Sequence, residues 1–156
     1  MSKFKPGASA PDFELEDQHG DTVRLSDYHG KGPVVIYFYP TDDTGGCTAE
    51  ACAFRDDFER FQAAGAAILG ISSDSVAGHK KFASKHSLPF TLLADPNGLV
   101  RKQYGVSNTL GFMPGRSTIV VDKEGVVRHV FTSQFEFTKH AEEALKAIEA
   151  TAAVSR

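Results

Sequence analysis

The chain has 156 residues, of which 41% are apolar and 24% charged, and its formal net charge is −3. This length is enough for a hydrophobic core without help from disulfides or metals, so we expect residues 1–156 to form a single domain. The composition argues against disorder, and the weakly acidic charge argues against binding to nucleic acid or to an anionic membrane surface, since either would need a basic patch.

The N-terminal sequence and the cysteine count bear on the compartment. The first 15 residues contain no apolar run of the kind found in secretory signals, and no segment approaches the roughly 20 apolar residues needed to span a bilayer. The chain has only two cysteines, which is typical of a reducing compartment where paired cysteines are more often catalytic than structural. We therefore expect a soluble cytoplasmic protein, with the mature form of an organellar protein as the alternative.

Hydrophobic periodicity and turn residues predict strands that alternate with helices. In the first half the expected elements are a β-hairpin of 13–17 and 22–25, a helical turn at 26–28, a strand over 34–39, a helix from about 46 to 64 closed by Gly65, a strand over 66–72 and a helix over 75–86. In the second half they are a strand over 90–94, a short helix over 99–104, a hairpin of 117–121 and 126–131, and an amphipathic helix from about 138. This order predicts an α/β domain of thioredoxin-like type, with a central mixed sheet flanked by helices and an N-terminal β-hairpin extension.

The two cysteines lie just after the apolar strand over 34–39. Pro40 ends that strand, and Gly45 and Gly46 are expected to bring the backbone through a tight turn. Cys47 then falls at or near the N-terminus of the next helix, where unpaired N–H groups and the helix dipole favour a thiolate over a neutral thiol. A thiolate is the nucleophilic form of cysteine, so the position predicts sulfur chemistry.

Cys52 lies five residues after Cys47, about 140° further around the helix axis. An intact helix would hold the two Cα atoms about 8.7 Å apart, whereas a disulfide tolerates no more than about 7 Å. The spacing therefore suits a switch between a folded dithiol and a locally unwound disulfide. From the spacing alone, two buried apolar thiols are an equally good interpretation. A zinc site is disfavoured because two cysteines without a neighbouring histidine pair leave the metal shell incomplete.

Residues close to Cys47 favour the catalytic interpretation. Thr44 has a hydroxyl able to cap the helix and to contact a bound oxygen, although an ordinary capping threonine explains it as well. Pro40 removes a hydrogen-bond donor and would shield one side of a pocket, although it also serves simply to stop the strand. The stripe formed by Cys47, Ala51, Phe54, Phe58 and Phe61 turns the cysteine toward the core.

Charged residues near the motif set a further requirement. Asp42 and Asp43 would disfavour a thiolate at Cys47 if they pointed inward, so we expect both to be solvated. A thiolate also calls for a cation, and our first candidate is Arg116, which precedes the strand over 117–121. Arg55, on the same helix as Cys47, is the second candidate. The six histidines are scattered along the chain and are expected to be surface or packing residues.

These residues resemble the active-site pattern of the peroxiredoxins, Pro-x-x-x-Thr-x-x-Cys, which Pro40, Thr44 and Cys47 match. A second cysteine five residues later is typical of the peroxiredoxin Q, or bacterioferritin comigratory protein, branch. The likeness covers nearly the whole chain and includes GCTAEACAFRD (46–56), GISSDS (70–75), LPFTLLAD (88–95) and PGRSTIVVD (114–122). Gly45 departs from the pattern, because the family commonly has proline there.

The resemblance implies a thiol peroxidase on a thioredoxin fold. Cys47 would be the peroxidatic cysteine, Cys52 the resolving one, and Arg116 would stabilise the thiolate and polarise the peroxide, with Thr44 and Pro40 completing the site. Hydrogen peroxide and alkyl hydroperoxides would be reduced through a sulfenic acid and an intramolecular Cys47–Cys52 disulfide, which thioredoxin would reduce again. The family needs no metal, haem, flavin or nucleotide cofactor, its role is antioxidant defence, and a monomer is the commoner state in this branch.

Three rival interpretations stay open at this point. The first is a one-cysteine peroxidase that uses glutathione or glutaredoxin, with Cys52 a bystander. The second is a thiol–disulfide oxidoreductase, which usually depends on a Cys-x-x-Cys motif that this chain lacks. The third is a non-catalytic interaction protein on the same fold.

Overall fold

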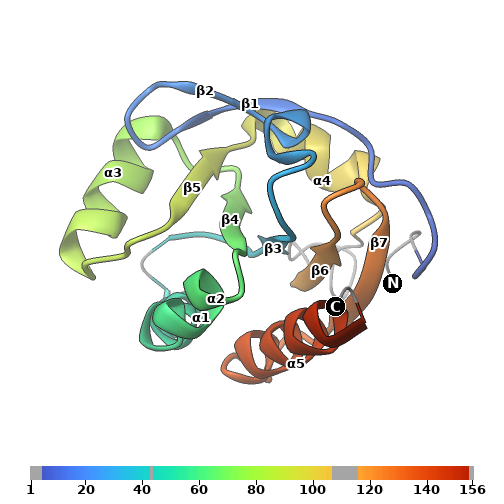
Figure 1. Ribbon diagram of the computed structural model, residues 1–156. Coiled ribbons are helices and arrows are strands. Elements are labelled where there is room, and N and C mark those ends of the chain that lie inside the picture. The colour runs from blue at the N-terminus through green and yellow to red at the C-terminus, as the bar shows by residue number, and fades with distance from the viewer. Residues whose placement is uncertain (1–4, 43, 107–115, 155–156) are drawn as a thin grey trace.

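The structure is a computed structural model that describes residues 5–42, 44–106 and 116–154. Within these ranges one seven-stranded mixed sheet runs through the molecule, with helices on both of its faces (Figure 1). The strands are β1 (Glu14–Asp17), β2 (Thr22–Arg24), β3 (Val34–Phe38), β4 (Ala67–Ser72), β5 (Thr91–Ala94), β6 (Ser117–Val121) and β7 (Val127–Thr132). Their order across the sheet is β2-β1-β5-β4-β3-β6-β7.

Three central strands are parallel and the outer ones antiparallel. Strand β4 pairs in parallel with β3 on one side and with β5 on the other, whereas β6 runs antiparallel to β3. The N-terminal hairpin of β1 and β2 adds to the sheet by antiparallel pairing of β1 with β5. This is the expected mixed sheet with its hairpin extension.

Strand β3 is buried on both faces of the sheet. Alternate side chains of a strand point to opposite faces, and those of β3 and the residue after it divide between two core clusters. Val35, Tyr37 and Tyr39 belong to one cluster, and Val34, Ile36 and Phe38 belong to the other. A continuous apolar run is therefore what a central strand of this sheet requires.

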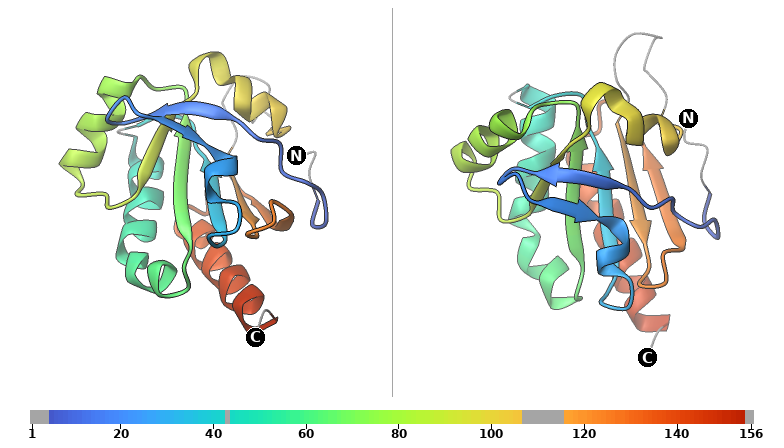
Figure 2. Two further views of the ribbon diagram at one scale, coloured as in Figure 1. Left: turned by 45° about the horizontal axis from the view of Figure 1, so that its top comes forward. Right: turned by 90° about the horizontal axis from the view of Figure 1, so that it is seen from above.

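The helices divide between the two clusters. Their bounds are α1 (Gly45–Asp56), α2 (Phe58–Ala63), α3 (Val76–Lys85), α4 (Leu99–Gln103) and α5 (Lys139–Val154), with short 3₁₀ helices η1 (Leu25–Tyr28) and η2 (Pro96–Gly98). Helices α1, α2 and α5 lie side by side against one face, and α4 lies on the other (Figures 1 and 2). None of the helices in the described ranges is long and apolar enough to cross a membrane.

One predicted element is wrong in its extent. A single helix was expected over 46–64, but the chain forms two helices separated at Asp57, whose φ of −97° and ψ of 7° leave helical geometry. The kink goes with full burial of Phe61, whose ring centroid lies 5.8 Å from that of Phe54. Phe58, expected on the buried stripe, is only partly buried as a result. The other bounds agree with the expected ones to within one or two residues.

Candidate active site

The predicted motif lies where the chain leaves the C-terminal end of β3 and starts α1. Ligands in sheets of this kind bind at the carboxyl ends of the parallel strands. Cys47 is in the first turn of α1 and is only 1% exposed. Pro40 is partly buried beside the end of β3, and its shielding role stays a prediction.

Thr44 is the N-cap of α1. Its hydroxyl oxygen accepts a hydrogen bond from the Cys47 backbone N–H at 3.4 Å, and its own hydroxyl donates to the Thr41 carbonyl at 3.3 Å. This cap satisfies one of the orphan N–H groups at the helix start and fixes where Cys47 lies. Thr44 is an exposed residue, so the cap lies at the surface of the protein.

The two glycines before Cys47 do not form the tight turn that was expected. Gly45 and Gly46 are the first two residues of α1, and neither has a positive φ. Gly46 is needed for a different reason: a Cβ atom there would lie 2.5 Å from Cε1 of Phe137, far inside contact distance. A Cβ atom at Gly45 would meet nothing within 4 Å. Tertiary packing, rather than backbone conformation, therefore explains the second glycine.

Arg116 is the cation beside Cys47. Phe38, the last residue of β3, pairs with Ser117 of β6, so Arg116 comes to the same edge of the sheet as the motif. Its Nη2 lies 3.4 Å from the Cys47 Sγ, and its Nε donates to the Gln134 carbonyl at 3.1 Å. A fixed guanidinium at this distance stabilises a thiolate and disfavours the neutral thiol.

Arg55, the second candidate, is held away from this position. Its Nη1 donates to the His86 carbonyl at 2.7 Å, and its Nη2 pairs with Asp56 at 3.2 Å. Both contacts lie toward α3 and the surface. Of the two candidate arginines, only Arg116 contacts the cysteine in the part of the chain that the structure describes.

Glu50 is a site residue that the sequence analysis missed. Its carboxylate is fully buried, and Arg116 Nη1 donates to its Oε1 at 2.5 Å. Burial raises the pKa of Glu50 to about 8, even though Arg116 acts to lower it. Its signal was present in the sequence, because Glu50 lies three residues after Cys47 on the same apolar side of the helix.

The raised pKa of Glu50 matters for Cys47. Burial by itself would lower the pKa of Arg116, but Glu50 and Cys47 together raise it above its ordinary value, so this arginine stays charged. One positive charge faces two groups able to be anions. Because Glu50 favours its protonated form near neutral pH, it competes little with the Cys47 sulfur for the charge of Arg116.

His140, on α5, is a further buried group next to Glu50. Its Nδ1 lies 2.8 Å from the Thr118 hydroxyl and 3.5 Å from Glu50 Oε2, and its Nε2 lies 2.7 Å from the Ser133 carbonyl. Since Nε2 faces a carbonyl, it carries the proton and Nδ1 accepts from Thr118. Burial lowers the pKa of His140 to about 4, so the ring is neutral and adds no second cation beside Arg116.

Cys52 is partly buried two turns into the site helix, and both cysteines are free thiols. Helix α1 is continuous from Gly45 to Asp56 and so holds both of them in the folded arrangement. The helical geometry that separates the Cα atoms by about 8.7 Å therefore applies to this form. A bond between the two sulfurs requires part of α1 to open.

Asp42 is not solvated, contrary to expectation. Its carboxylate is only 7% exposed, lies 2.7 Å from Nδ1 of His79, and accepts a 2.6 Å hydrogen bond from the Tyr39 hydroxyl. The His79 ring is fully buried, and its Nε2 donates to the Leu93 carbonyl at 2.9 Å. A buried acidic group is tolerated when it is paired in this way, and its charge is directed toward His79. Asp43 lies outside the described residues.

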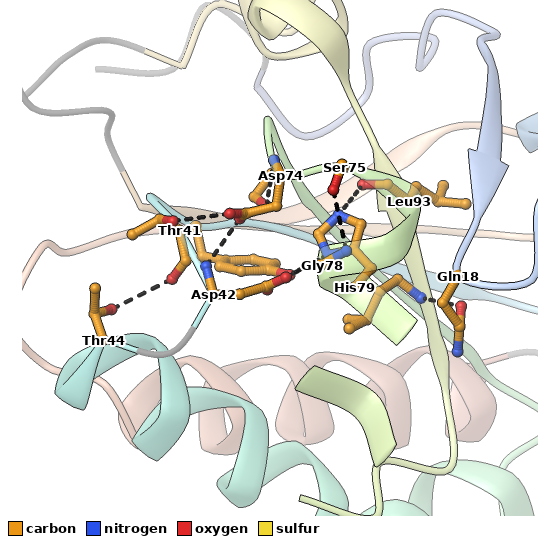
Figure 3. A network of polar contacts seen from close by, with 12 residues as sticks. Gln18, Thr41, Asp42, Thr44, Asp74, Ser75, Gly78, His79 and Leu93 are labelled. Atoms are coloured by element: carbon orange, nitrogen blue, oxygen red, sulfur yellow. Dashed lines mark hydrogen bonds and ion pairs between the residues drawn. The ribbon is translucent and has the colours of Figure 1, made fainter. Parts of the chain in front are cut away.

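The contacts of Asp42 extend as a hydrogen-bonded network to the start of α1 (Figure 3). The Asp42 backbone N–H donates to Asp74 at 2.8 Å, and the Thr41 hydroxyl donates to the other Asp74 oxygen at 2.9 Å. The Thr41 carbonyl in turn accepts from Thr44, the residue that caps Cys47. Helix α3 and strand β5 thus anchor the segment that precedes the cysteine. The sequence analysis expected His79 to be a surface or packing residue and gave it no partner.

A buried cysteine at a capped helix N-terminus, with an arginine on its sulfur, defines a thiol-dependent enzyme site. Residues 6–130 match the AhpC/TSA family. With this match over most of its length, the chain belongs to the AhpC/TSA family.

Within the family the likeness is to peroxiredoxin Q. The chain is 53% identical over 148 residues to the chloroplastic peroxiredoxin Q of Triticum aestivum, covering 94% of this chain and 68% of that protein. The peroxidoxin BcpB structure of Mycobacterium tuberculosis superimposes with a TM-score of 0.87 at 41% identity, covering 94% of this chain and 97% of that one. A bacterioferritin comigratory protein of Xanthomonas campestris gives a TM-score of 0.83 at 32% identity, covering 97% and 99%.

These similarities bear on three predictions. The resemblance to the peroxiredoxin Q branch is confirmed, and so is the thioredoxin-like α/β fold. The prediction that the chain is a thiol peroxidase is confirmed at the level of the enzyme class. The roles of individual residues stay predictions and are taken up below.

Proposed function

We propose that Cys47 is the peroxidatic cysteine of a peroxidase that reduces hydrogen peroxide and alkyl hydroperoxides. The observation that carries this proposal is the 3.4 Å contact between Arg116 Nη2 and the Cys47 sulfur at the capped start of α1. The similar Xanthomonas campestris protein is described by its alkyl peroxide reduction activity, which supports the same class of substrate here. The fold is proposed to act as a single domain over 1–156.

In the first step the Cys47 thiolate attacks the terminal peroxide oxygen. A sulfur–oxygen bond forms and the oxygen–oxygen bond breaks, so that Cys47 becomes a sulfenic acid and an alkoxide or hydroxide leaves and takes up a proton. Arg116 contacts the Cys47 sulfur and the Thr44 oxygen contacts the Cys47 backbone N–H. Both groups would orient the two peroxide oxygens, with Arg116 stabilising the negative charge that develops on them. Pro40 is proposed to shield the same pocket.

In the second step the Cys52 thiol condenses with the Cys47 sulfenic acid. A disulfide forms between the two sulfurs and one water molecule is released. Helix geometry keeps the Cα atoms about 8.7 Å apart, so the first turns of α1 must open before the bond forms. A thioredoxin-type dithiol then reduces the disulfide by two thiol exchanges and restores both thiols.

Replacing each cysteine by serine tests these roles. Cys47→Ser should abolish peroxide consumption with a thioredoxin system. Cys52→Ser should still consume about one equivalent of peroxide but lose turnover, because the sulfenic acid has no partner. Full turnover of Cys52→Ser with the thioredoxin system would contradict the two-cysteine mechanism and favour the one-cysteine alternative.

Two further properties are proposed, the oligomeric state and the location. A monomer is proposed because the reaction as written needs only residues of one chain, and size-exclusion chromatography with light scattering tests it. A cytoplasmic location is proposed from the composition. The wheat relative is named as chloroplastic, and an organellar location of this protein is the alternative. Fractionation of cells, followed by immunoblotting of each compartment, decides between the two.

A further inference from the structure

Phe137 lies in residues 133–138, the connection between β7 and α5, and its ring rests on the start of α1. A Cβ atom built at Gly46 would lie 2.5, 2.7 and 3.0 Å from three carbons of this ring, and these are the three nearest atoms. The ring therefore packs directly against the Gly46 backbone, one residue before Cys47. Phe137 itself is half-buried in this position.

The same ring also covers Arg116. The guanidinium carbon lies 4.9 Å from the ring centroid, within the range of a cation–π contact. Three residues before Phe137, the connection contacts Arg116 a second time, through the 3.1 Å hydrogen bond that Nε donates to the Gln134 carbonyl. One short connection thus contacts two parts of the site: the first turn of α1, which carries Cys47, and Arg116, which faces it.

We propose that Phe137 is a positioning residue that holds the first turn of α1 closed and thereby sets how fast Cys47 reaches Cys52. The inference rests on the proposed two-cysteine mechanism and adds a residue to it. Opening α1 moves Gly46 away from the ring, so the contact exists only in the closed form and opposes opening. Slow opening in turn prolongs the life of the sulfenic acid and exposes it to a second peroxide, which carries it to sulfinic acid.

Phe135 provides a matched control in the same connection. It is 71% exposed, and no contact with α1 or Arg116 is described for it. Phe135→Ala and Phe137→Ala remove the same group from positions two residues apart. A difference between them therefore reports the contact of Phe137 rather than the loss of an aromatic ring from this segment.

The first experiment follows disulfide formation by stopped flow after one equivalent of hydrogen peroxide, in full-length protein. We expect Phe137→Ala to form the Cys47–Cys52 disulfide about 3- to 10-fold faster than wild type, the range that corresponds to loss of one or two buried methylene equivalents of packing between the ring and Gly46. The fraction over-oxidised per turnover at high peroxide should fall by the same factor. Phe137→Leu keeps bulk against Gly46 but loses the ring, so its effect should be smaller and in the same direction. Phe135→Ala should match wild type.

A second experiment tests the contact itself through a double-mutant cycle with Gly46→Ala. In the wild-type background the added methyl group collides with the ring, so Gly46→Ala should speed disulfide formation. In the Phe137→Ala background the ring is gone and alanine favours helix over glycine, so the same substitution should slow it. The sign of the Gly46→Ala effect therefore reverses between the two backgrounds.

Hydrogen exchange of the reduced proteins gives a readout that does not depend on peroxide. Residues 45–49 should exchange faster in Phe137→Ala than in Phe135→Ala, while both retain similar melting temperatures. Equal disulfide rates in these two variants, or a Gly46→Ala effect of the same sign in both backgrounds, would overturn the role of Phe137. Failure of the proposed function is seen separately, as the absence of any Cys47–Cys52 disulfide in oxidised wild-type protein by mass spectrometry.

Discussion

Gly45 stands where the family commonly has proline, and its position in the structure makes Gly45→Pro a sharp test of helix opening. Gly45 is the first residue of α1, where the backbone N–H has no partner within the helix and proline is favoured. A Cβ atom there would meet no atom within 4 Å. Thr44, which would precede the proline, already has an extended backbone with φ −93° and ψ 156°, as a residue before proline requires. The substitution therefore fits without strain.

The expected magnitude follows from the loss of backbone freedom in the opened state. A proline at a compatible position stabilises the closed form by about 0.4–1 kcal/mol, chiefly by restricting the unfolded segment. This corresponds to an opening equilibrium about 2- to 5-fold less favourable. Disulfide formation in Gly45→Pro should slow by that factor, and the fraction of Cys47 over-oxidised per turnover should rise by it.

The assay is mass spectrometry of Cys47 after a series of peroxide concentrations, with stopped-flow measurement of disulfide formation in parallel. Gly45→Ala is the matched control, because it adds a side chain in the same open space but keeps the N–H and a freer backbone. It should shift both quantities in the same direction by a smaller factor. If Gly45→Pro over-oxidises no more readily than wild type, the opening of α1 does not limit disulfide formation and the reasoning is refuted.

Three other predictions concern the residues around the cysteine. Arg116→Ala should lower the second-order rate with peroxide by about 10²–10³, the usual cost of one preorganised charge, whereas Arg55→Ala should change it little; stopped-flow rates of the two variants compare them directly. Wild-type protein should lose stability on the order of 1 kcal/mol between pH 6.5 and 8, and Glu50→Gln should abolish this loss. The urea midpoints of the variant should therefore no longer fall over this range. His79→Ala should cost about 3–5 kcal/mol, because it leaves the buried Asp42 carboxylate unpaired, and should lower the melting temperature far more than Lys80→Ala on the exposed side of α3.

The direction of the pH effect follows from the pKa of Glu50. In the folded state it is about 8, against an ordinary value of 4.5, because the carboxyl is buried. The folded protein therefore binds this proton more tightly than the unfolded chain does, and stability falls as pH rises between those two values. His140 has the opposite effect, since its pKa is lowered from 6.5 to about 4 and its contribution to stability is lost as pH falls below 6.5.

Between pH 6.5 and 8 Glu50 makes the larger contribution of this pair, and the smaller one of His140 is common to wild type and Glu50→Gln, so the two proteins are compared over this range. Wild-type urea midpoints that stay level from pH 6.5 to 8 would contradict the raised pKa. For the other two predictions, a larger rate loss in Arg55→Ala than in Arg116→Ala would reassign the cation. Equal melting temperatures for His79→Ala and Lys80→Ala would show that the Asp42–His79 pair does not anchor the segment before α1.

The sequence by itself determined the local part of the site. The strand end, the cap and the helix start follow from neighbouring residues. The order Pro40, Thr44, Cys47 therefore predicted both the place of the cysteine and the residue that caps its helix. The five-residue spacing to Cys52 likewise depends only on helix geometry. These properties depend on residues only a few positions apart, so they can be predicted directly from the sequence.

Only the tertiary structure decided which distant groups meet this local motif. Arg116 is 69 residues from Cys47 and reaches it because β6 pairs with β3 in one register. The burial that gives Glu50 its raised pKa and the contact between Phe137 and Gly46 depend equally on how α5 and its preceding connection pack against α1. Asp42 pairs with a histidine 37 residues away, which is why its charge could not be placed from its neighbours. Such contacts depend on strand register and helix packing across the whole fold, and no single stretch of sequence encodes them.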